Sequence, residues 1–246
     1  MTTLAIVRKE LRLYFGSALV YVLAAVILVL AGYLFYTNLH FYVLFGGQNL
    51  ERGLWMNQFL DMRQLLIVLV PMLTMRLLAE ERRLGTLELL WTYPLRDVEI
   101  VLAKFLAAWG VLMLIVGATA LQPLLLARIH PFPAGPVVAG YLGLGLLAAA
   151  FVACGLFVSA LTDSQLVAAA ATYGVLLFFW LLNWNEAAVS DGWLRVLRPL
   201  SIFDRFELFT TGGVDTRDVV YFVVVTVVFL GVTVLALESR RWRGIR

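Results

Sequence analysis

Apolar residues gather into six long runs along the chain, and short polar or proline-rich segments separate these runs. A transmembrane helix needs roughly 20 apolar residues, because each residue rises about 1.5 Å and the hydrocarbon core is about 30 Å thick. The pattern therefore predicts an all-α polytopic membrane protein with six transmembrane helices. Their expected ranges are about 19–36, 59–79, 98–127, 137–161, 166–184 and 218–237.

Two prolines are expected to alter these spans. Pro71 should kink the second span and Pro123 should bend the third near its outer end, because proline lacks an N–H and its ring crowds the preceding turn. In the last outer connection, Leu200–Phe209 mixes aromatic and charged residues, which predicts a short helix returning to the outer interface. No connection is long enough for a second domain, so residues 1–246 are expected to form a single transmembrane domain.

The segment that precedes the first span has a helical amphipathic pattern. Its apolar face holds Leu4, Val7, Leu11 and Phe15, and its other positions include Arg8, Lys9 and Arg12. Such a stripe predicts that residues 1–16 form an interfacial helix on the cytoplasmic leaflet. The alternative is a charged leader into the first span.

Small and amide side chains within the spans predict contacts between helices. The small residues of the fourth span are Gly140, Gly143, Gly145, Ala149, Ala153 and Gly155. They favour close approach of this span to its neighbours, and Gln122 and Asn183 are candidates for interhelical hydrogen bonds.

Composition supports the membrane assignment. Hydrophobic residues make up 62% of the chain and charged residues 14%, against about half and a quarter in a soluble domain. A soluble enzyme, a disordered tail and a nucleic-acid binder are therefore excluded. The single cysteine, Cys154, allows no intrachain disulfide, and the distant His40 and His130 suggest no metal site.

The distribution of basic residues predicts the orientation. With the N-terminus inside, twelve Lys and Arg residues fall on the cytoplasmic side, Lys104 among them, and seven fall outside, Arg63 among them. Because cytoplasmic loops are enriched in Lys and Arg, both termini and residues 80–97 are expected in the cytoplasm.

The cytoplasmic link between the second and third spans, residues 80–97, carries the most information. Charged residues crowd Glu80–Arg83, Gly85 interrupts the chain, and Thr86–Trp91 predicts a short apolar helix that stops before Pro94. An apolar helix outside the bilayer requires a groove, in its own bundle or in a partner. The simpler alternative is a juxtamembrane charge cluster attracted to anionic lipid.

After this link, Asp97 is the expected N-cap of the third span and Glu99 lies in its first turn. A simpler role for Gly85 is to cap the C-terminal end of the helix that precedes it.

The stretch AEERRLGTLELLWTYPLRDVEIVLAKFLAA resembles the type-2 ABC exporter permeases. The likeness is greatest to the gliding-motility-associated group, which is related to the permease of the nitrous-oxide-reductase maturation operon. The matching residues are Pro71, Thr74–Arg76, Ala79–Glu81, Gly85–Thr86, Glu88–Leu90, Pro94, Lys104–Phe105, Gly155–Thr162 and Leu237–Trp242. The first outer loop departs most from the family, which leaves the substrate open.

The resemblance implies a permease of the bacterial cytoplasmic (inner) membrane whose cytoplasmic link is a coupling helix docked on an ATPase subunit. The expected contact residues are Glu80, Glu81, Arg82, Arg83, Gly85, Thr86, Leu87, Glu88 and Trp91. The chain has no G-x-x-x-x-G-K-[ST] motif. ATP and Mg²⁺ are therefore expected on a separate nucleotide-binding subunit, with no cofactor and no enzymatic activity in this chain.

Other expected partners are membrane lipid and a second permease chain, identical or paralogous. The first or fifth span and the aromatic segment Leu200–Phe209 are the expected contacts between permeases. The sequence leaves the transported substrate open among lipids, glycans, peptides, drugs and sulfur- or copper-related species.

Three other classes of membrane protein fit the sequence less well. An intramembrane protease of the E-E-x-x-x-R type is disfavoured because Gly85 occupies the arginine position, and no G-x-S-G motif supports rhomboid chemistry. Proton-relay transport would require more ionisable residues within the spans. A non-transporting scaffold or a channel subunit would explain the spans but not the ordered link.

Overall fold

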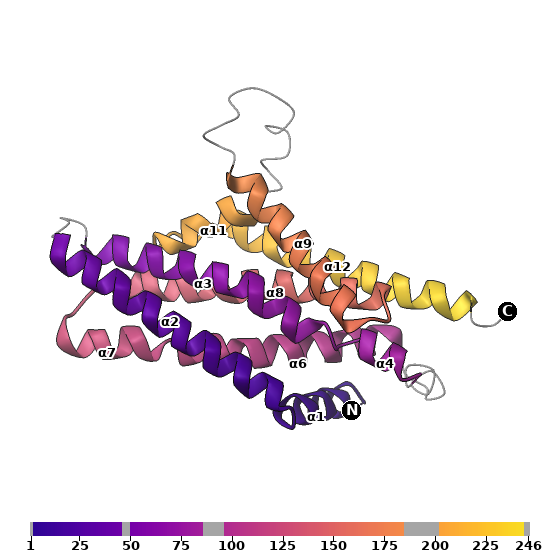
Figure 1. The fold of residues 1–246 in the computed structure, drawn as a ribbon. Coiled ribbons are helices and arrows are strands. Elements are labelled where there is room, and N and C mark those ends of the chain that lie inside the picture. The colour runs from indigo at the N-terminus through magenta and orange to yellow at the C-terminus, as the bar shows by residue number, and fades with distance from the viewer. Residues whose placement is uncertain (1, 46–49, 86–95, 185–201, 244–246) are drawn as a thin grey trace.

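The structure is a computed structural model that describes residues 2–45, 50–85, 96–184 and 202–243 (Figure 1). All regular elements in these ranges are helices. They are α1 (Thr2–Phe15), α2 (Ala18–Phe45), α3 (Leu50–Thr74), α4 (Ala79–Arg83), α6 (Asp97–Ala118), α7 (Leu121–Ile129), α8 (Ala134–Leu161), α9 (Gln165–Trp184), α11 (Ile202–Thr210) and α12 (Thr216–Arg243).

Five helical stretches within the described ranges are long and apolar enough to cross a membrane. They are Ala18–Leu44, Gly53–Arg83, Asp97–Ile129, Ala134–Leu161 and Thr216–Ser239. The apolar part of α9, Gln165–Leu181, is shorter than these. Five of the six expected spans therefore coincide with helices that are long and apolar enough to cross a membrane, the sixth stays a prediction, and the chain is a multi-pass membrane protein.

Helix α8 lies at the centre of the bundle, where α3, α6, α9, α11 and α12 pack around it. In its apolar stretch 72% of the residues are buried, against 22% in α2 and in α12. The two outer helices therefore present most of their apolar surface to the surroundings of the chain.

Glycines in α8 permit this central position. A Cβ at Gly140 would overlap the ring of Phe59, and a Cβ at Gly143 would lie 2.7 Å from the Cβ of Phe209. At Gly155 it would overlap Thr74 at the end of α3. The prediction of close packing is confirmed at these three positions, because only a hydrogen side chain leaves room for the neighbouring helix.

The helix breaks near the two prolines do not fall at the prolines themselves. Pro71 lies inside α3, which ends three residues later at Thr74. The third span breaks upstream of Pro123, between Ala118 and Leu121. Pro123 has no N–H to donate to the carbonyl of Thr119 one turn earlier, so the helix ends there and restarts as α7.

Helix α11 confirms the short helix expected near residues 200–209. Phe203, Phe206 and Phe209 are fully buried within the chain, and the rings of Phe203 and Phe151 lie 6.0 Å apart. These aromatic side chains are therefore not exposed to a second permease in this structure. Arg63 of α3 is only 6% exposed and lies 4.9 Å from the centre of the Phe203 ring, so it is not an outer surface cation.

One predicted amide contact is present between α3 and α7. The Nε2 of Gln58 donates a hydrogen bond of 2.9 Å to the Oε1 of Gln122. The side chain of Asn183 lies outside the described part of the structure.

Candidate functional site

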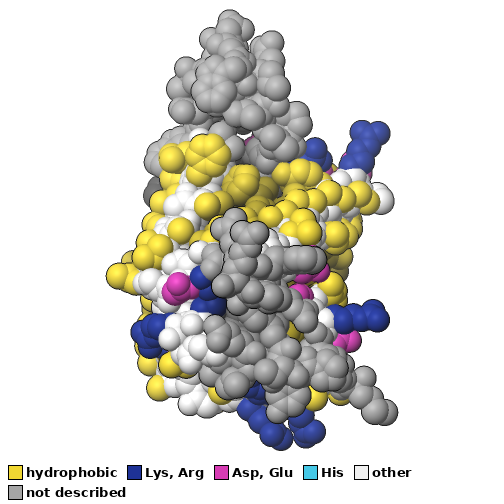
Figure 2. All heavy atoms as spheres, turned by 90° about the vertical axis from the view of Figure 1, so that its right-hand side faces the viewer, with side chains coloured by type: hydrophobic (Ala, Val, Ile, Leu, Met, Phe, Trp, Pro, Cys, Tyr) yellow, Lys and Arg dark blue, Asp and Glu magenta, His cyan; other side chains and the backbone are white. Residues whose placement is uncertain are grey.

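The candidate site is built around α4, at the start of the link between the second and third expected spans. Helix α4 follows α3 after a short turn and lies toward the same end of the bundle as α1 and the C-terminal end of α12 (Figure 1). Viewed from that side, the surface carries Lys, Arg, Asp and Glu side chains among hydrophobic ones (Figure 2).

The C-terminal end of α8 holds the start of α4. The backbone N–H groups of Leu78 and Ala79 each donate to the Oγ of Ser159 at 3.1 Å. The Ser159 hydroxyl in turn donates to the carbonyl of Met75 at 3.4 Å. Because the first N–H groups of a helix have no intrahelical acceptor, the serine oxygen satisfies two buried donors at once.

Arg82 attaches α4 to the turn between α8 and α9. Its Nη1 donates to the carbonyl of Ala160 at 2.8 Å. Its Nη2 forms an ion pair with Asp163 in the turn. The fixed planar guanidinium therefore joins two consecutive parts of the α8–α9 connection to one position on α4.

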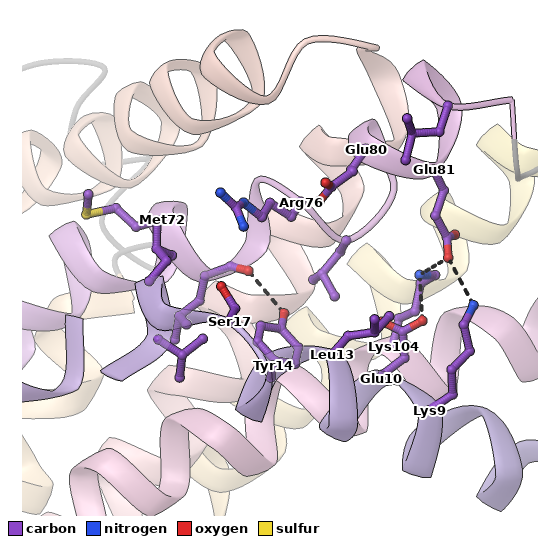
Figure 3. A pocket seen from close by; sticks show the side chains of 15 residues that line it. Lys9, Glu10, Leu13, Tyr14, Ser17, Met72, Arg76, Glu80, Glu81 and Lys104 are labelled. Atoms are coloured by element: carbon purple, nitrogen blue, oxygen red, sulfur yellow. Dashed lines mark hydrogen bonds and ion pairs between the residues drawn. The ribbon is translucent and has the colours of Figure 1, made fainter. Parts of the chain in front are cut away.

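Glu81 attaches α4 to the opposite side of the bundle. The Nζ of Lys104 in α6 lies 2.9 Å from the Oε1 of Glu81 and 3.0 Å from the Oε1 of Glu10 in α1 (Figure 3). Lys104 is 1% exposed and Glu10 is 5% exposed. Lys9 reaches Glu81 at 3.8 Å from a mostly exposed position.

We call Glu10, Lys104 and Glu81 the buried ion triad. A buried charge is stable only when it is paired and hydrogen-bonded, so these three side chains hold α1, α4 and α6 in one arrangement. Together with Arg82 and Ser159, they connect α4 to four parts of the protein. A displacement of α4 cannot occur without moving these contacts.

A further contact ties α1 to the end of α3. The hydroxyl of Tyr14 donates to the carbonyl of Leu73 at 3.0 Å. Burial, and to a lesser extent the Glu10 carboxylate, raises the pKa of the Tyr14 phenol well above its ordinary value. The phenol therefore keeps its proton and remains a donor to α3.

The structure places the predicted site residues unevenly. Glu80, Glu81 and Arg82 are partly buried, whereas Arg83 is exposed. Gly85 follows α4 with φ +67°, and its N–H donates to the carbonyl of Arg82 at 3.1 Å, so the glycine cap is confirmed. Thr86, Leu87, Glu88 and Trp91 lie outside the described residues.

The expected N-cap at Asp97 is wrong. Helix α6 begins at Asp97, and Arg96 is its N-cap. The N–H of Arg96 donates to the Oε2 of Glu99 at 3.4 Å. A carboxylate at the third helical position can satisfy the N-cap N–H by reaching backwards, so Glu99 acts where Asp97 was expected.

Sequence reasoning missed Glu10, Lys104, Ser159 and Asp163 as members of the site. Lys104 was counted as a cytoplasmic surface charge, but it is enclosed in the bundle. A lysine inside an apolar run is itself a signal that a counterion must lie nearby. Ser159 falls within the family-like stretch Gly155–Thr162, but nothing in the local pattern assigns a contact to it or to Asp163.

In the described ranges, no three His, Cys, Asp or Glu side chains are grouped in a way that could hold a metal ion. The arrangement around α4 is one of ion pairs and hydrogen bonds between helices.

Comparison of the sequence with known families finds a match. A family model described as ABC-2 family transporter protein matches residues 62–200, which is more than half of the 246-residue chain. No curated protein matches the sequence. The matched range contains α4, α6 and α8, and with them most of the contacts described above. The chain therefore belongs to the ABC-2 transporter family and is a membrane permease subunit of an ABC transporter.

Proposed function

We propose that the chain is the permease of an ABC exporter and that residues 80–97 transmit ATP-driven movement from a separate ATPase subunit. The observation that carries this proposal is the attachment of α4 to α1, α6, the end of α8 and the α8–α9 turn. A force on the link would reach one side of the bundle through Glu81 and the other side through Arg82.

The same contacts argue against a simple solvated charge cluster. Side chains that only anchor a span in lipid headgroups should point into solvent. Glu81 and Arg82 instead have side-chain exposures of 14% and 13% and are engaged within the protein. Arg83, which is exposed, is the member of the cluster that fits the lipid-anchor interpretation.

We further propose six spans, with both termini and α4 on the cytoplasmic side of the bacterial inner membrane. The start of α1 and the end of α12 lie toward the same side of the bundle as α4 (Figure 1), which supports an even number of crossings. Helix α9 has 20 residues and would supply the sixth. If the buried Lys104 and Arg63 are left out, the basic residues divide eleven (12 − 1) to six (7 − 1), which favours the same orientation.

Labelling would test this orientation. In a Cys154-free chain, Gln48→Cys and Ser190→Cys are expected to react with an impermeant reagent added outside, and Thr92→Cys is not. Outside labelling of Thr92→Cys would contradict the proposed topology.

The complete transporter is proposed to contain two permeases, identical or paralogous, and two ATPase subunits that bind ATP and Mg²⁺. Support for pairing comes from α2, whose apolar stretch is only 22% buried and so leaves a long surface for lipid or a second permease. The motif likeness described above supports kinship with the gliding-motility-associated group.

Purification of the full chain in mild detergent tests the proposal directly. The wild-type chain is expected to retain a P-loop ATPase subunit and to raise its ATPase rate in lipid nanodiscs. Arg82→Gln should lower that stimulation, whereas the exposed Arg128→Gln at the outer end of α7 should leave it unchanged. A chain that recruits no ATPase subunit would instead support a non-transporting scaffold.

A further inference from the structure

A cavity of about 360 Å³ opens between α1, the start of α2, the end of α3 and α4 (Figure 3). Helix α1 provides one wall, the α3–α4 turn provides the other, and Lys104 of α6 also lines the cavity. The cavity is therefore bounded by the same helices that the buried ion triad connects.

Six charged side chains line this cavity, and four of them interact with one another. Lys104 binds Glu10 and Glu81, and Lys9 reaches Glu81. Arg76 and Glu80, in contrast, make no ion pair with any described residue, and the Arg76 guanidinium points away from Glu80 (Figure 3). Among the residues that the structure describes, the cavity thus offers one cation and one anion without an ion-pair partner.

The remaining lining is largely apolar, and part of it continues onto the surface. Leu13 is 58% exposed and Met72 is 39% exposed at the cavity. Val68 lies one turn before Met72 on the same face of α3 and is 47% exposed. An apolar track therefore leads from the cavity along a helix that crosses the membrane.

The position of the cavity matches the headgroup level of a bilayer. It lies between an amphipathic helix, α1, and the ends of two apolar helices that cross the membrane. Amphipathic helices of this kind lie at the boundary between headgroups and acyl chains. A ligand that enters the cavity from the membrane would meet charged groups and an apolar surface together.

We propose that this cavity binds the headgroup of a zwitterionic glycerophospholipid with a primary amine, phosphatidylethanolamine. Its phosphate would bind Arg76, its ammonium group would donate to Glu80, and an acyl chain would lie along Met72 and Val68. The volume is within the range of small-ligand sites and accommodates a headgroup rather than a whole lipid.

Charge complementarity selects this lipid class. An anionic headgroup without an amine would bring negative charge to Glu80 and leave that carboxylate unpaired. A choline headgroup carries no N–H and cannot donate a hydrogen bond to it. The bound lipid would contact α1, α3 and α4 simultaneously and so stabilise the coupling segment against the bundle. This inference rests on the proposed function only for the assignment to the cytoplasmic leaflet.

Native mass spectrometry of the full-length permease tests the proposal. The protein would be taken from nanodiscs of phosphatidylcholine alone or mixed with equal amounts of phosphatidylethanolamine or phosphatidylglycerol. We expect at least one phosphatidylethanolamine to be retained several-fold more often than either other lipid. Arg76→Gln should lower retention of phosphatidylethanolamine at least fivefold, and Glu80→Gln should abolish its preference over phosphatidylglycerol.

The exposed Arg12→Gln on α1, which does not line the cavity, provides the matched control and should behave like the wild type. Thermal unfolding of each variant checks that it remains folded. Equal retention of all three lipids, a preference for phosphatidylglycerol, or unchanged retention in both cavity variants would overturn the proposal. No ATPase subunit is present in this measurement, so a failure of the coupling proposal would not alter its outcome.

Discussion

Replacement of Lys104 by methionine, alone or together with both carboxylates, should separate two effects of the buried ion triad. One is its effect on the stability of the bundle, and the other is its effect on coupling to the ATPase subunit. Lys104 lies 3.0 Å from Glu10 and 2.9 Å from Glu81, and its side chain is 2% exposed. At these distances each attraction is worth about 5 kcal/mol before desolvation, with an effective dielectric constant of about 20. Desolvation of the three groups offsets most of this gain, so the net contribution of the buried ion triad is small.

The cost of Lys104→Met comes from the carboxylates that it leaves behind. Glu10 has a side-chain exposure of 7% and would lose its cation in a buried site beside a second carboxylate. Breaking a buried pair in this way lowers the free energy of unfolding by about 3–5 kcal/mol. The combined Glu10→Leu, Lys104→Met and Glu81→Leu variant removes all three charges and should recover most of that loss.

Equilibrium unfolding in mixed micelles, followed by tryptophan fluorescence, measures these differences. Lys9→Met is the matched control, because Lys9 is 56% exposed and 3.8 Å from Glu81, so its removal should change stability by less than about 1 kcal/mol. The triple variant should be stable but should stimulate the ATPase weakly. A single Lys104→Met variant as stable as the wild type would refute the energetic argument, and full stimulation by the triple variant would refute the transmission role.

Three further substitutions test individual contacts by the same unfolding measurement. Gly85→Ala should cost about 1 kcal/mol, because alanine disfavours φ +67° although nothing lies within 4 Å of its Cβ. Gly85→Asn should cost less, and equal costs would contradict the backbone explanation. Ser159→Ala should cost about 1–3 kcal/mol by leaving two buried N–H groups without an acceptor, and Ser159→Thr is the comparison that keeps the hydroxyl. Gly140→Ala should cost about 1–3 kcal/mol through overlap with Phe59. A second substitution, Phe59→Leu, should relieve part of that cost. Additive effects of the two substitutions would show that the two positions do not interact.

The spans were predictable because lipid imposes a simple requirement on the backbone. Every N–H and C=O in the hydrocarbon region must bond within the helix, so runs of apolar residues predict helices directly. The break before Pro123 was harder to place, because proline acts on the carbonyl of Thr119 one turn earlier. The shorter apolar stretch of α9 left the sixth span undecided by length alone.

The candidate site was predictable only as a charged segment. The sequence identified Glu80–Arg83, but not the opposite directions taken by Glu81 and Arg82. Adjacent residues on a helix point about 100° apart, so Glu81 reaches α1 and α6 while Arg82 reaches the end of α8 and the α8–α9 turn. The pairing of Glu10 with Lys104 joins residues 94 positions apart, and only the folded bundle brings them together.

The order of Glu10, Glu81 and Lys104 along the chain bears on how the protein is made. A lysine within a membrane helix is costly to insert, at most roughly 2.5–3.5 kcal/mol at the helix centre and less near an end, where Lys104 lies in α6, and synthesis proceeds from the N-terminus. Both carboxylates precede the lysine, Glu10 by 94 positions and Glu81 by 23 (104 − 81). When α6 leaves the ribosome, both carboxylates have therefore already been synthesised, and each can pair with the lysine as soon as α6 packs against α1 and α4.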